Sequence, residues 1–291
     1  MTKTTTTSDR LVALVRDTSS ALPADVLKAI AAARRRERRG SSAAAVLDTV
    51  LENCALAQEK GVPLCQDTGT LTFFVDRALR GRVTPALIRR AVARATGRGY
   101  LRRNCIDPVD GRSYDDNCAE GAPVIHYVDP GDVPGLPPRG VALIMKGGGS
   151  ENMSRQYSLP DQDLGAGRDL AGVKACILDA VKRALGYGCA PGILGVAVGG
   201  DRAAGFETAK AQLLRRLDEK PRAGSPRERA LARLEREVLR EANALGIGPM
   251  GLGGATTLLG VKIAARPRVP ASFFVTVAYM CWACRRRVIT L

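Results

Sequence analysis

The segment C-A-P-G-I-L-G-V-A-V-G-G (189–200) decides the fold, because it leads from a cysteine in a short loop into an apolar run of strand type. The run Ile193–Val198 predicts a strand. Apolar residues recur at intervals of three and four over Leu170–Leu185 before it and over Glu207–Leu217 after it, which predicts a helix on each side. A strand between two helices is typical of a sheet layer that helices cover.

The same alternation continues along the rest of the chain. Helical periodicity predicts further helices over Pro23–Arg39, Thr84–Thr96 and Pro226–Leu245. Thr84-Pro85 and Ser225-Pro226 each provide an N-cap followed by a proline at the first helical position. Further strand-type runs are Leu71–Val75, Gly121–Val128, Val141–Met145, Thr257–Ile263 and Ser272–Tyr279. We therefore predict an α+β fold, with mixed sheet layers flanked by helices.

The start of the chain, M-T-K-T-T-T-T-S-D-R, is polar and rich in threonine. We expect residues 1–20 to form a disordered or loosely held leader. A chain of 291 residues fits one large domain or two small ones. The proline- and glycine-rich segment 129–140 is typical of a connection inside a domain, so residues 21–291 are expected to form a single domain.

The composition is strongly basic, with 44 Lys and Arg against 29 Asp and Glu and a net charge of +15. The basic runs Arg34–Arg39 and Arg285–Arg287 lack interleaved aromatic residues, and only 4% of the chain is aromatic. We therefore expect a solvated basic surface that binds no nucleic acid. The remaining role for the charge is to steer a dicarboxylate or to dock an acidic partner.

Apolar runs stay well short of the ~20 residues that cross a membrane, so no membrane association is expected. The start lacks the apolar region of an export signal. Eight cysteines in a chain without such a signal indicate a reducing compartment, where thiols serve metals or catalysis more often than disulfides. The expected location is the cytoplasm.

Three cysteines stand at the mouths of glycine-rich or short polar turns: Cys65 in G-V-P-L-C-Q-D-T-G-T, Cys189 in G-Y-G-C-A-P-G, and Cys281 in A-Y-M-C-W-A-C-R. Three converging thiolates would bind three irons of a cubane [4Fe–4S] cluster and leave the fourth iron open as a Lewis acid. Their spacing does not establish a cluster, since buried cysteine also packs well as a small hydrophobe.

That packing role is the preferred interpretation for two of the other cysteines. Cys54 and Cys176 each lie in an apolar stretch of helical type. Cys105 and Cys118 lie in a polar loop, and the sequence leaves their role open.

Polar groups that suit a hydroxy acid follow the first of the three turn cysteines. Asp67 could hydrogen-bond a substrate hydroxyl or move a proton, although D-T-G is also a common turn whose side chains satisfy local backbone. Arg102 offers a planar fork for one carboxylate. Gly148, in the middle of Gly147–Gly149, allows close backbone approach and is a candidate anion cradle.

Six motifs occur in an order that resembles the α subunit of class I fumarate hydratases and of the related L-tartrate dehydratases. They are P-L-C-Q-D-T-G-T (63–70), L-R-R-N (101–104), K-G-G-G-S-E-N-M-S (146–154), C-A-P-G-I-L-G-V-A-V-G-G (189–200), G-I-G-P-M-G-L-G-G-A-T-T (246–257) and C-W-A-C-R-R (281–286). The segment S-E-N-M-S resembles the fumarases, whereas the tartrate dehydratases tend to carry a G-G-G-C-like loop there.

The resemblance implies an enzyme, an iron–sulfur hydro-lyase whose [4Fe–4S] cluster has three cysteine ligands and one open iron. The implied ligands are Cys65, Cys189 and Cys281, the last preferred over Cys284 because the family pattern C-W-A-x-R has the ligand first. Substrate contacts are implied for Gln66, for Asp67, which also moves the proton, and for Arg102. The cradle glycine Gly148 is added to this substrate-binding set.

The implied reaction is the reversible hydration of fumarate to L-malate. It implies a second module, a β subunit or a C-terminal domain, that supplies further Arg and Lys and the catalytic base in a larger hetero-oligomer. One alternative is a dehydratase of L-tartrate or another hydroxy-diacid. Another is a non-catalytic iron–sulfur scaffold, because Val269 stands where the family usually has a proton-handling histidine. The chain's single histidine, His126, lies in an apolar run and is expected to be packed.

Overall fold

The computed structural model describes residues 6–220 and 224–291 and confirms the predicted mixture of helices and mixed sheets. The chain forms two compact units, each with its own four-stranded sheet. The β1 unit comprises the described residues up to Pro23, Glu52–Gly148 and Ala283–Leu291. The β7 unit comprises Ala24–Leu51 and Gly149–Trp282. The single domain expected over residues 21–291 stays a prediction, and the two units are described separately below.

The β1 unit is built on a sheet with the strand order β10-β5-β1-β4. Strand β1 (Thr70–Asp76) runs parallel to β4 (Val124–Val128) and antiparallel to β5 (Gly140–Lys146). Its apolar core gathers Phe73 and Val75 of β1 with Ile88 of helix α4. The unit also contains η1 (Arg77–Leu79), α4 (Pro85–Gly97), β2 (Cys105–Ile106), β3 (Ser113–Tyr114) and η2 (Pro130–Asp132).

Helix α1 (Thr7–Ser20) corrects the expectation of a loosely held leader. Thr6 caps the helix, since its hydroxyl accepts a hydrogen bond from the backbone N–H of Asp9 at 3.1 Å. Leu11, Leu14 and Val15 are buried in the core of the β1 unit, and α1 packs on α4. Thr6, part of the threonine run that suggested disorder, is therefore a helix cap. Residues 1–5 of the predicted leader lie outside the described residues.

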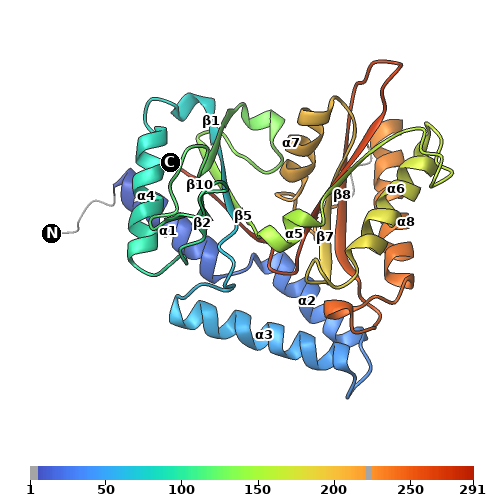
Figure 1. Ribbon diagram of the computed structural model, residues 1–291, viewed down its shortest axis with the longest axis horizontal. Helices are drawn as coiled ribbons and strands as arrows, with labels where there is room; N and C mark the ends of the chain where they lie inside the picture. The colour runs from blue at the N-terminus through green and yellow to red at the C-terminus, as the bar shows by residue number, and fades with distance from the viewer. Residues whose placement is uncertain (1–5, 221–223) are drawn as a thin grey trace. The chain divides into compact units, whose positions relative to one another are not determined.

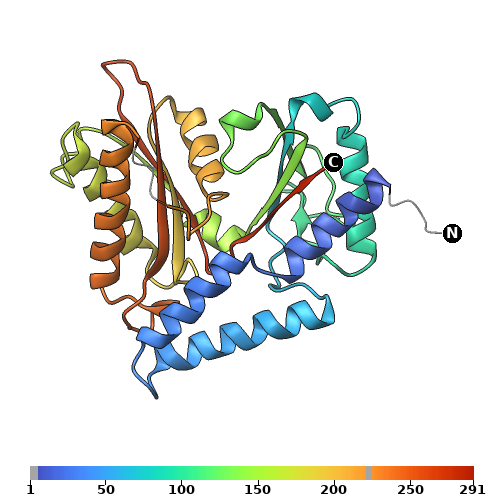
Figure 2. The same ribbon diagram turned by 180° about the vertical axis from the view of Figure 1, so that it is seen from behind.

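Strand β10 (Arg285–Thr290) lies beside β5 in antiparallel register, red beside green in Figures 1 and 2. The sequence predicted a solvated basic surface here, which is wrong for Arg285 and Arg286, because their exposed fractions are 1% and 8%. Three consecutive arginines hide the apolar alternation by which a strand is recognised. Pairing with β5, a contact far away in sequence, decides the strand.

The β7 unit is built on a second sheet with the strand order β6-β9-β7-β8, which Figure 1 shows with helices on both faces. Strand β7 (Gly192–Gly199) runs parallel to β8 (Leu258–Arg266) and antiparallel to β9 (Phe274–Met280), which in turn pairs with β6 (Arg155–Ser158). Helices α6 (Leu170–Ala184) and α8 (Pro226–Ala244) share the larger core with the sheet. The unit also contains α2 (Ala24–Arg36), α5 (Gly148–Asn152, which begins on the last residue of the β1 unit) and η3 (Pro249–Gly251), whereas α3 (Ser42–Lys60) contributes to both units.

Helix α7 (Arg202–Gln212) lies on the sheet face opposite α6 and α8 (Figure 1). It starts five residues earlier than the sequence indicated, because Asp201 caps it by accepting from the N–H groups of Ala203 and Ala204 at 2.9 and 3.0 Å. The other predicted helices and strands appear within a few residues of their expected bounds. In the part of the chain that the structure describes, no helix combines the length and apolar character needed to cross a membrane.

Glu37 is a buried carboxylate, 7% exposed, inside a run that the sequence marks as basic and solvated. Its oxygens accept hydrogen bonds from the backbone N–H groups of Ala255, at 2.9 and 3.1 Å, and Thr256, at 3.0 Å. Ala255 and Thr256 lie near the C-terminal end of the glycine-rich segment 246–257. Because glycines contribute no side chains of their own to hold a loop, the segment depends on a carboxylate from elsewhere in the β7 unit.

We expect Glu37→Ala to lower the free energy of unfolding by about 2 kcal/mol or more, because it leaves buried N–H groups without an acceptor. Urea unfolding followed by circular dichroism measures this difference. The matched control is Glu52→Ala, at an exposed helical position, which is expected to change the free energy by less than about 0.5 kcal/mol. Equal effects of the two substitutions would contradict the anchoring role of Glu37.

Candidate functional site

Asp67 is held on both of its carboxylate oxygens within the β1 unit. The side-chain amide of Asn104 donates to Oδ1 at 2.9 Å, and the backbone N–H of Gly148 donates to Oδ2 at 2.7 Å. Two donors on opposite oxygens fix both the position and the rotation of the carboxylate. The sequence proposed Gly148 as a cradle for a substrate anion, and in the structure the carboxylate of Asp67 accepts its N–H.

The loop that carries Arg102 and Asn104 is fixed by two buried polar side chains, Thr68 and Asn117, which are 2% and 4% exposed. The hydroxyl of Thr68 donates to the carbonyl oxygen of Arg102 at 2.8 Å and accepts from its N–H at 3.1 Å. Asn117 donates to the same carbonyl at 2.9 Å and accepts from the N–H of Asn104 at 2.8 Å. The D-T-G turn therefore holds a distant loop as well as itself.

The two arginines of L-R-R-N differ in their contacts. Arg103 forms an exposed ion pair with Asp115 at 3.3 Å. The Arg102 side chain is exposed, and within residues 6–220 and 224–291 its guanidinium forms no hydrogen bond or ion pair. The fixed backbone of Arg102 thus presents a guanidinium that can take an external carboxylate.

Gly69 lets the Asp67 turn approach the glycine loop at Gly147. Its φ is +71°, and a Cβ there would lie 2.4 Å from the carbonyl oxygen of Lys146 and 2.7 Å from the nitrogen of Gly147. A larger residue would push the two segments apart. The close approach is what brings the N–H of Gly148 within hydrogen-bonding distance of Asp67.

Cys65 is half-buried in the same turn, and its Sγ accepts the backbone N–H of Asp67 at 3.4 Å. Gln66, between them, is exposed. The β1 unit thus brings together a thiol, a fixed carboxylate, a glycine loop and the backbone of the arginine loop. The sequence predicted these residues separately, and Thr68, Asn104 and Asn117 are the supporting residues that it did not assign.

The β7 unit brings together the two other turn cysteines. The backbone N–H of Trp282 donates to the carbonyl oxygen of Cys189 at 3.2 Å, which joins the loop before β7 to the segment after β9. Cys281 is half-buried and Cys189 exposed. Cys189 has a φ of +52°, a left-handed conformation that costs a non-glycine residue about 1 kcal/mol or more. The loop is held there by Gly192, whose N–H donates to Thr257 at 2.9 Å.

Tyr279 adds a polar group to this pair of cysteines. It is 1% exposed, and among the described residues its hydroxyl has no hydrogen-bond partner. Burial raises the pKa of Tyr279 above its usual range, and the thiols of Cys281 and Cys189 raise the pKa further. A buried hydroxyl with no partner, beside two thiols, fits a site for a sulfur-rich group.

Two of the remaining cysteines, Cys54 and Cys176, are buried as the sequence indicated. Cys54 and Cys176 are buried at 4% and 0% exposure, and burial raises their thiol pKa values to about 11 and about 12. Both fit the packing role, because a thiol with so high a pKa is a poor source of the thiolate that binds metals. Cys284, the alternative to Cys281, is fully buried and belongs to the β1 unit.

The candidate ligands are distributed over both units, with Cys65 in the β1 unit and the other two in the β7 unit. Among the described residues, no three His, Cys, Asp or Glu side chains are grouped so as to hold a metal ion. The donor chemistry nevertheless fits an iron–sulfur cluster, since such clusters are held by thiolates and tuned by hydrogen bonds to their sulfurs.

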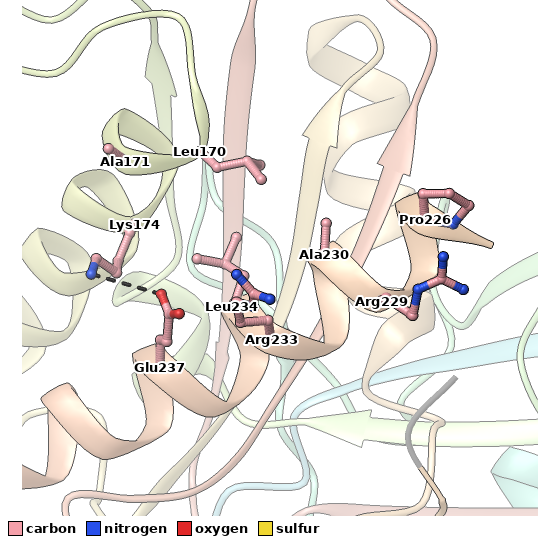
Figure 3. Close-up of a pocket in the computed structure, with 9 residues that line it drawn as sticks. All are labelled: Leu170, Ala171, Lys174, Pro226, Arg229, Ala230, Arg233, Leu234 and Glu237. Atoms are coloured by element: carbon pink, nitrogen blue, oxygen red, sulfur yellow. Dashed lines mark ion pairs between the residues drawn. The ribbon is translucent and has the colours of Figure 1, made fainter. Parts of the chain in front are cut away.

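A surface groove of about 480 Å³ lies between α6 and α8 and is shown in Figure 3. Lys174, at its edge, forms an ion pair with Glu237 at 3.9 Å. None of the sequence-predicted site residues lines this groove, whose walls are Leu170, Ala171, Lys174, Pro226, Arg229, Ala230, Arg233, Leu234 and Glu237. The candidate site is therefore distinct from the groove.

Val269 lies in the connection between β8 and β9 and is 64% exposed. His126 lies in β4 of the β1 unit, where its ring stacks on Phe74 with the ring centroids 5.2 Å apart. This packing agrees with the role expected for His126.

Comparisons with known proteins point in one direction. A sequence model of the family described as fumarate hydratase (Fumerase) matches residues 8–290. A Geobacillus stearothermophilus protein named putative fumarate hydratase class I is 45% identical over 285 residues, which are 94% of this chain and 52% of that protein. A Methanocaldococcus jannaschii protein named putative L(+)-tartrate dehydratase subunit alpha is 33% identical over 288 residues, 97% of this chain and 96% of that protein.

The L(+)-tartrate dehydratase subunit alpha of Escherichia coli K12 is 28% identical over 244 residues, 83% of this chain and 76% of that protein. The chain spans about half the length of the Geobacillus relative, at 52%. The resemblance that the six motifs indicated is confirmed. A family model matches residues 8–290, and a relative is 45% identical over 94% of this chain, so the chain belongs to the fumarate hydratase (Fumerase) family.

Proposed function

We propose that this chain is the cluster-binding part of an iron–sulfur hydro-lyase that interconverts fumarate and L-malate. The observation that carries the proposal is the carboxylate of Asp67, held on both oxygens two residues after Cys65. A carboxylate so fixed beside a thiol is arranged to act on a ligand at that sulfur. The 45% identity to a protein named as a class I fumarate hydratase supports the reaction.

The proposed cluster is a [4Fe–4S] cluster with Cys65, Cys189 and Cys281 as ligands. When bound, it would supply an open iron, a Lewis acid that polarises the hydroxyl and a carboxylate of the substrate. We favour Cys281 over Cys284 because Cys281 lies in the segment whose Trp282 N–H donates to the carbonyl of Cys189. Cys284 is fully buried.

The chain's own residues orient the substrate and handle the proton. Asp67 uses the remaining lone pairs of its two oxygens to accept a hydrogen bond from the substrate hydroxyl. It takes up the proton that water releases when it adds to fumarate, and it returns this proton when L-malate loses its hydroxyl as water. Arg102 pairs with the distal carboxylate in a bidentate manner. Gln66, exposed beside Asp67, donates its amide to the same substrate. Gly148 contributes through Asp67, to which its N–H donates.

A second module completes the proposed enzyme. The Geobacillus relative is about twice as long as its match to this chain, which covers 52% of it, and the Methanocaldococcus relative is named a subunit alpha. We infer a β subunit or further domain that supplies more basic residues and the catalytic base, in a hetero-oligomer. Eight cysteines suit a reducing compartment, which supports the cytoplasm as its place.

Dehydration of L-tartrate is the second candidate function. It is favoured by the Methanocaldococcus relative, which matches this chain over 96% of its own length and is named a tartrate dehydratase subunit. The S-E-N-M-S segment favours fumarate. A non-catalytic scaffold is the remaining alternative, because Val269 has no ionisable group that could transfer a proton. Assays with L-malate, fumarate and L-tartrate separate the three.

Cluster ligation is tested with serine variants of the three proposed ligands. Cys65→Ser, Cys189→Ser and Cys281→Ser should each lose most of the iron and acid-labile sulfide bound after anaerobic reconstitution, because serine is a poor cluster ligand. Cys54→Ala and Cys176→Ala, which change only packing, should keep both. Iron and sulfide per chain are the measured quantities. Full iron in Cys281→Ser with loss in Cys284→Ser would reassign the third ligand.

The role of Asp67 and of the Asn104 hydrogen bond that holds it is tested by kinetics of the assembled enzyme. Asp67→Asn should lower kcat for fumarate hydration by ~10²-fold or more, as expected for a proton-handling group. Asn104→Ala should lower kcat about tenfold, the equivalent of one lost hydrogen bond of about 1.4 kcal/mol. The neighbouring control Arg103→Ala removes only an exposed ion pair and should stay near the wild-type rate. A wild-type rate in Asp67→Asn would remove this residue from the mechanism.

The two-module arrangement predicts that the chain alone has negligible hydratase activity. Co-production with a β-subunit-like protein should restore turnover of fumarate and L-malate, because half of the substrate contacts come from that module. Steady-state rates of the isolated chain and of the complex are compared at equal cluster content. Robust turnover by the isolated chain would show that it needs no partner.

A further inference from the structure

We propose that the hydroxyl of Tyr279 donates a hydrogen bond to a sulfur of the iron–sulfur cluster and so sets the cluster's reduction potential. The inference rests on the proposed function, since it takes Cys189 and Cys281 as cluster ligands. It concerns a residue that neither binds substrate nor ligates iron. Tyr279 is therefore proposed as a residue that tunes the cluster.

The first observation is the position of the Tyr279 ring. A Cβ at Gly188 would lie 2.3 Å from Cε1 of the ring, and a Cβ at Gly192 would lie 2.5 Å from both Cζ and the hydroxyl oxygen. The ring therefore lies directly against the backbone on both sides of Cys189, and only glycine at 188 and 192 permits it. The hydroxyl reaches the start of β7, at the base of the cysteine loop.

The second observation is that the hydroxyl is buried without a partner. Tyr279 is 1% exposed, and in the described part of the chain its hydroxyl forms no hydrogen bond. Tyrosine hydroxyls that are buried usually find a partner, because leaving one unsatisfied is costly. Tyr157, on the neighbouring strand β6, shows the usual arrangement, since its hydroxyl donates to Asp179 at 2.9 Å. The exception at Tyr279 calls for an acceptor that residues 6–220 and 224–291 do not provide.

The third observation identifies the acceptor as sulfur. Cys281 follows Tyr279 by two residues, and Cys189 lies between the two glycines whose backbone the ring contacts. The Trp282 hydrogen bond at 3.2 Å holds the two cysteine segments together. An electron-rich cysteine thiolate or inorganic sulfide bound at this pair would be the missing acceptor, and hydrogen bonds to such sulfurs tune reduction potentials.

The direction of the effect follows from charge. Reduction adds one negative charge to the cluster, and a hydroxyl that donates to its sulfur stabilises that charge. Removal of the donor should therefore make reduction harder. The loss of one hydrogen bond corresponds to roughly a tenfold change in the equilibrium constant for reduction, or ~59 mV for a one-electron couple.

The experiment compares the full-length wild type with Tyr279→Phe and Tyr157→Phe after anaerobic cluster reconstitution. Phenylalanine keeps the ring against Gly188 and Gly192 and removes only the hydroxyl. Redox titration followed by electron paramagnetic resonance gives the midpoint potential. We expect Tyr279→Phe to be roughly tenfold harder to reduce and Tyr157→Phe to match the wild type. Electron–nuclear double resonance of the reduced wild type in H₂O and D₂O should show an exchangeable proton coupled to the cluster that Tyr279→Phe lacks.

The outcomes separate the inference from the proposed function. Equal midpoint potentials in the three proteins, all carrying the cluster, would overturn the role of Tyr279 and leave the cluster assignment intact. A wild type that binds no iron or sulfide would overturn both. A shift of the same size in Tyr157→Phe would show a general effect of the fold and would also overturn the inference. If Tyr279→Phe fails to hold a cluster, the exchangeable proton in the wild type decides, and its absence contradicts the contact.

Discussion

The glycine-rich segments have few side chains of their own, so their backbone hydrogen-bonding groups must be satisfied by residues from elsewhere. This constraint shapes both units. In the β1 unit the N–H of Gly148 donates to Asp67, and in the β7 unit the N–H groups of Ala255 and Thr256 donate to Glu37. Asn243 does the same for Thr257 and Leu258, each at 2.8 Å. A few polar side chains thereby fix loops that could not fix themselves.

One of the hydrogen bonds that hold a glycine-rich loop also involves a residue of the proposed site. At Asp67 the acceptor of the loop N–H is also the carboxylate proposed to handle the proton, so the loop and the site hold each other. Around Cys189 the glycines act differently, because they leave room for the ring of Tyr279 to lie against the backbone. In the first case small residues position a polar group by hydrogen bonding, and in the second they admit a large one by close approach.

The net charge of the chain did not predict where individual charged residues lie. The +15 net charge predicted a solvated basic surface, yet Arg285 and Arg286 are buried at the start of β10 and Glu37 is a buried acceptor within a basic run. Arginine side chains can enter a sheet because their long apolar stems pack against neighbouring side chains. Arg102 is exposed, as its proposed contact with substrate requires, whereas Arg103 pairs with Asp115.

The sequence by itself determined the family, the mixed fold and most of the helices and strands, because these depend on local periodicity, capping residues and motifs read in order. It also separated Cys54 and Cys176, which are buried, from the turn cysteines. Only the tertiary structure decided that α1 is packed, that β10 is a strand and that the chain forms two units, since each follows from contacts between residues far apart in sequence. The hydrogen bonds of Asn104 and Thr68 and the unpartnered hydroxyl of Tyr279 belong to that second class. The sequence specifies the type of each side chain, whereas the folded structure determines which residues it contacts.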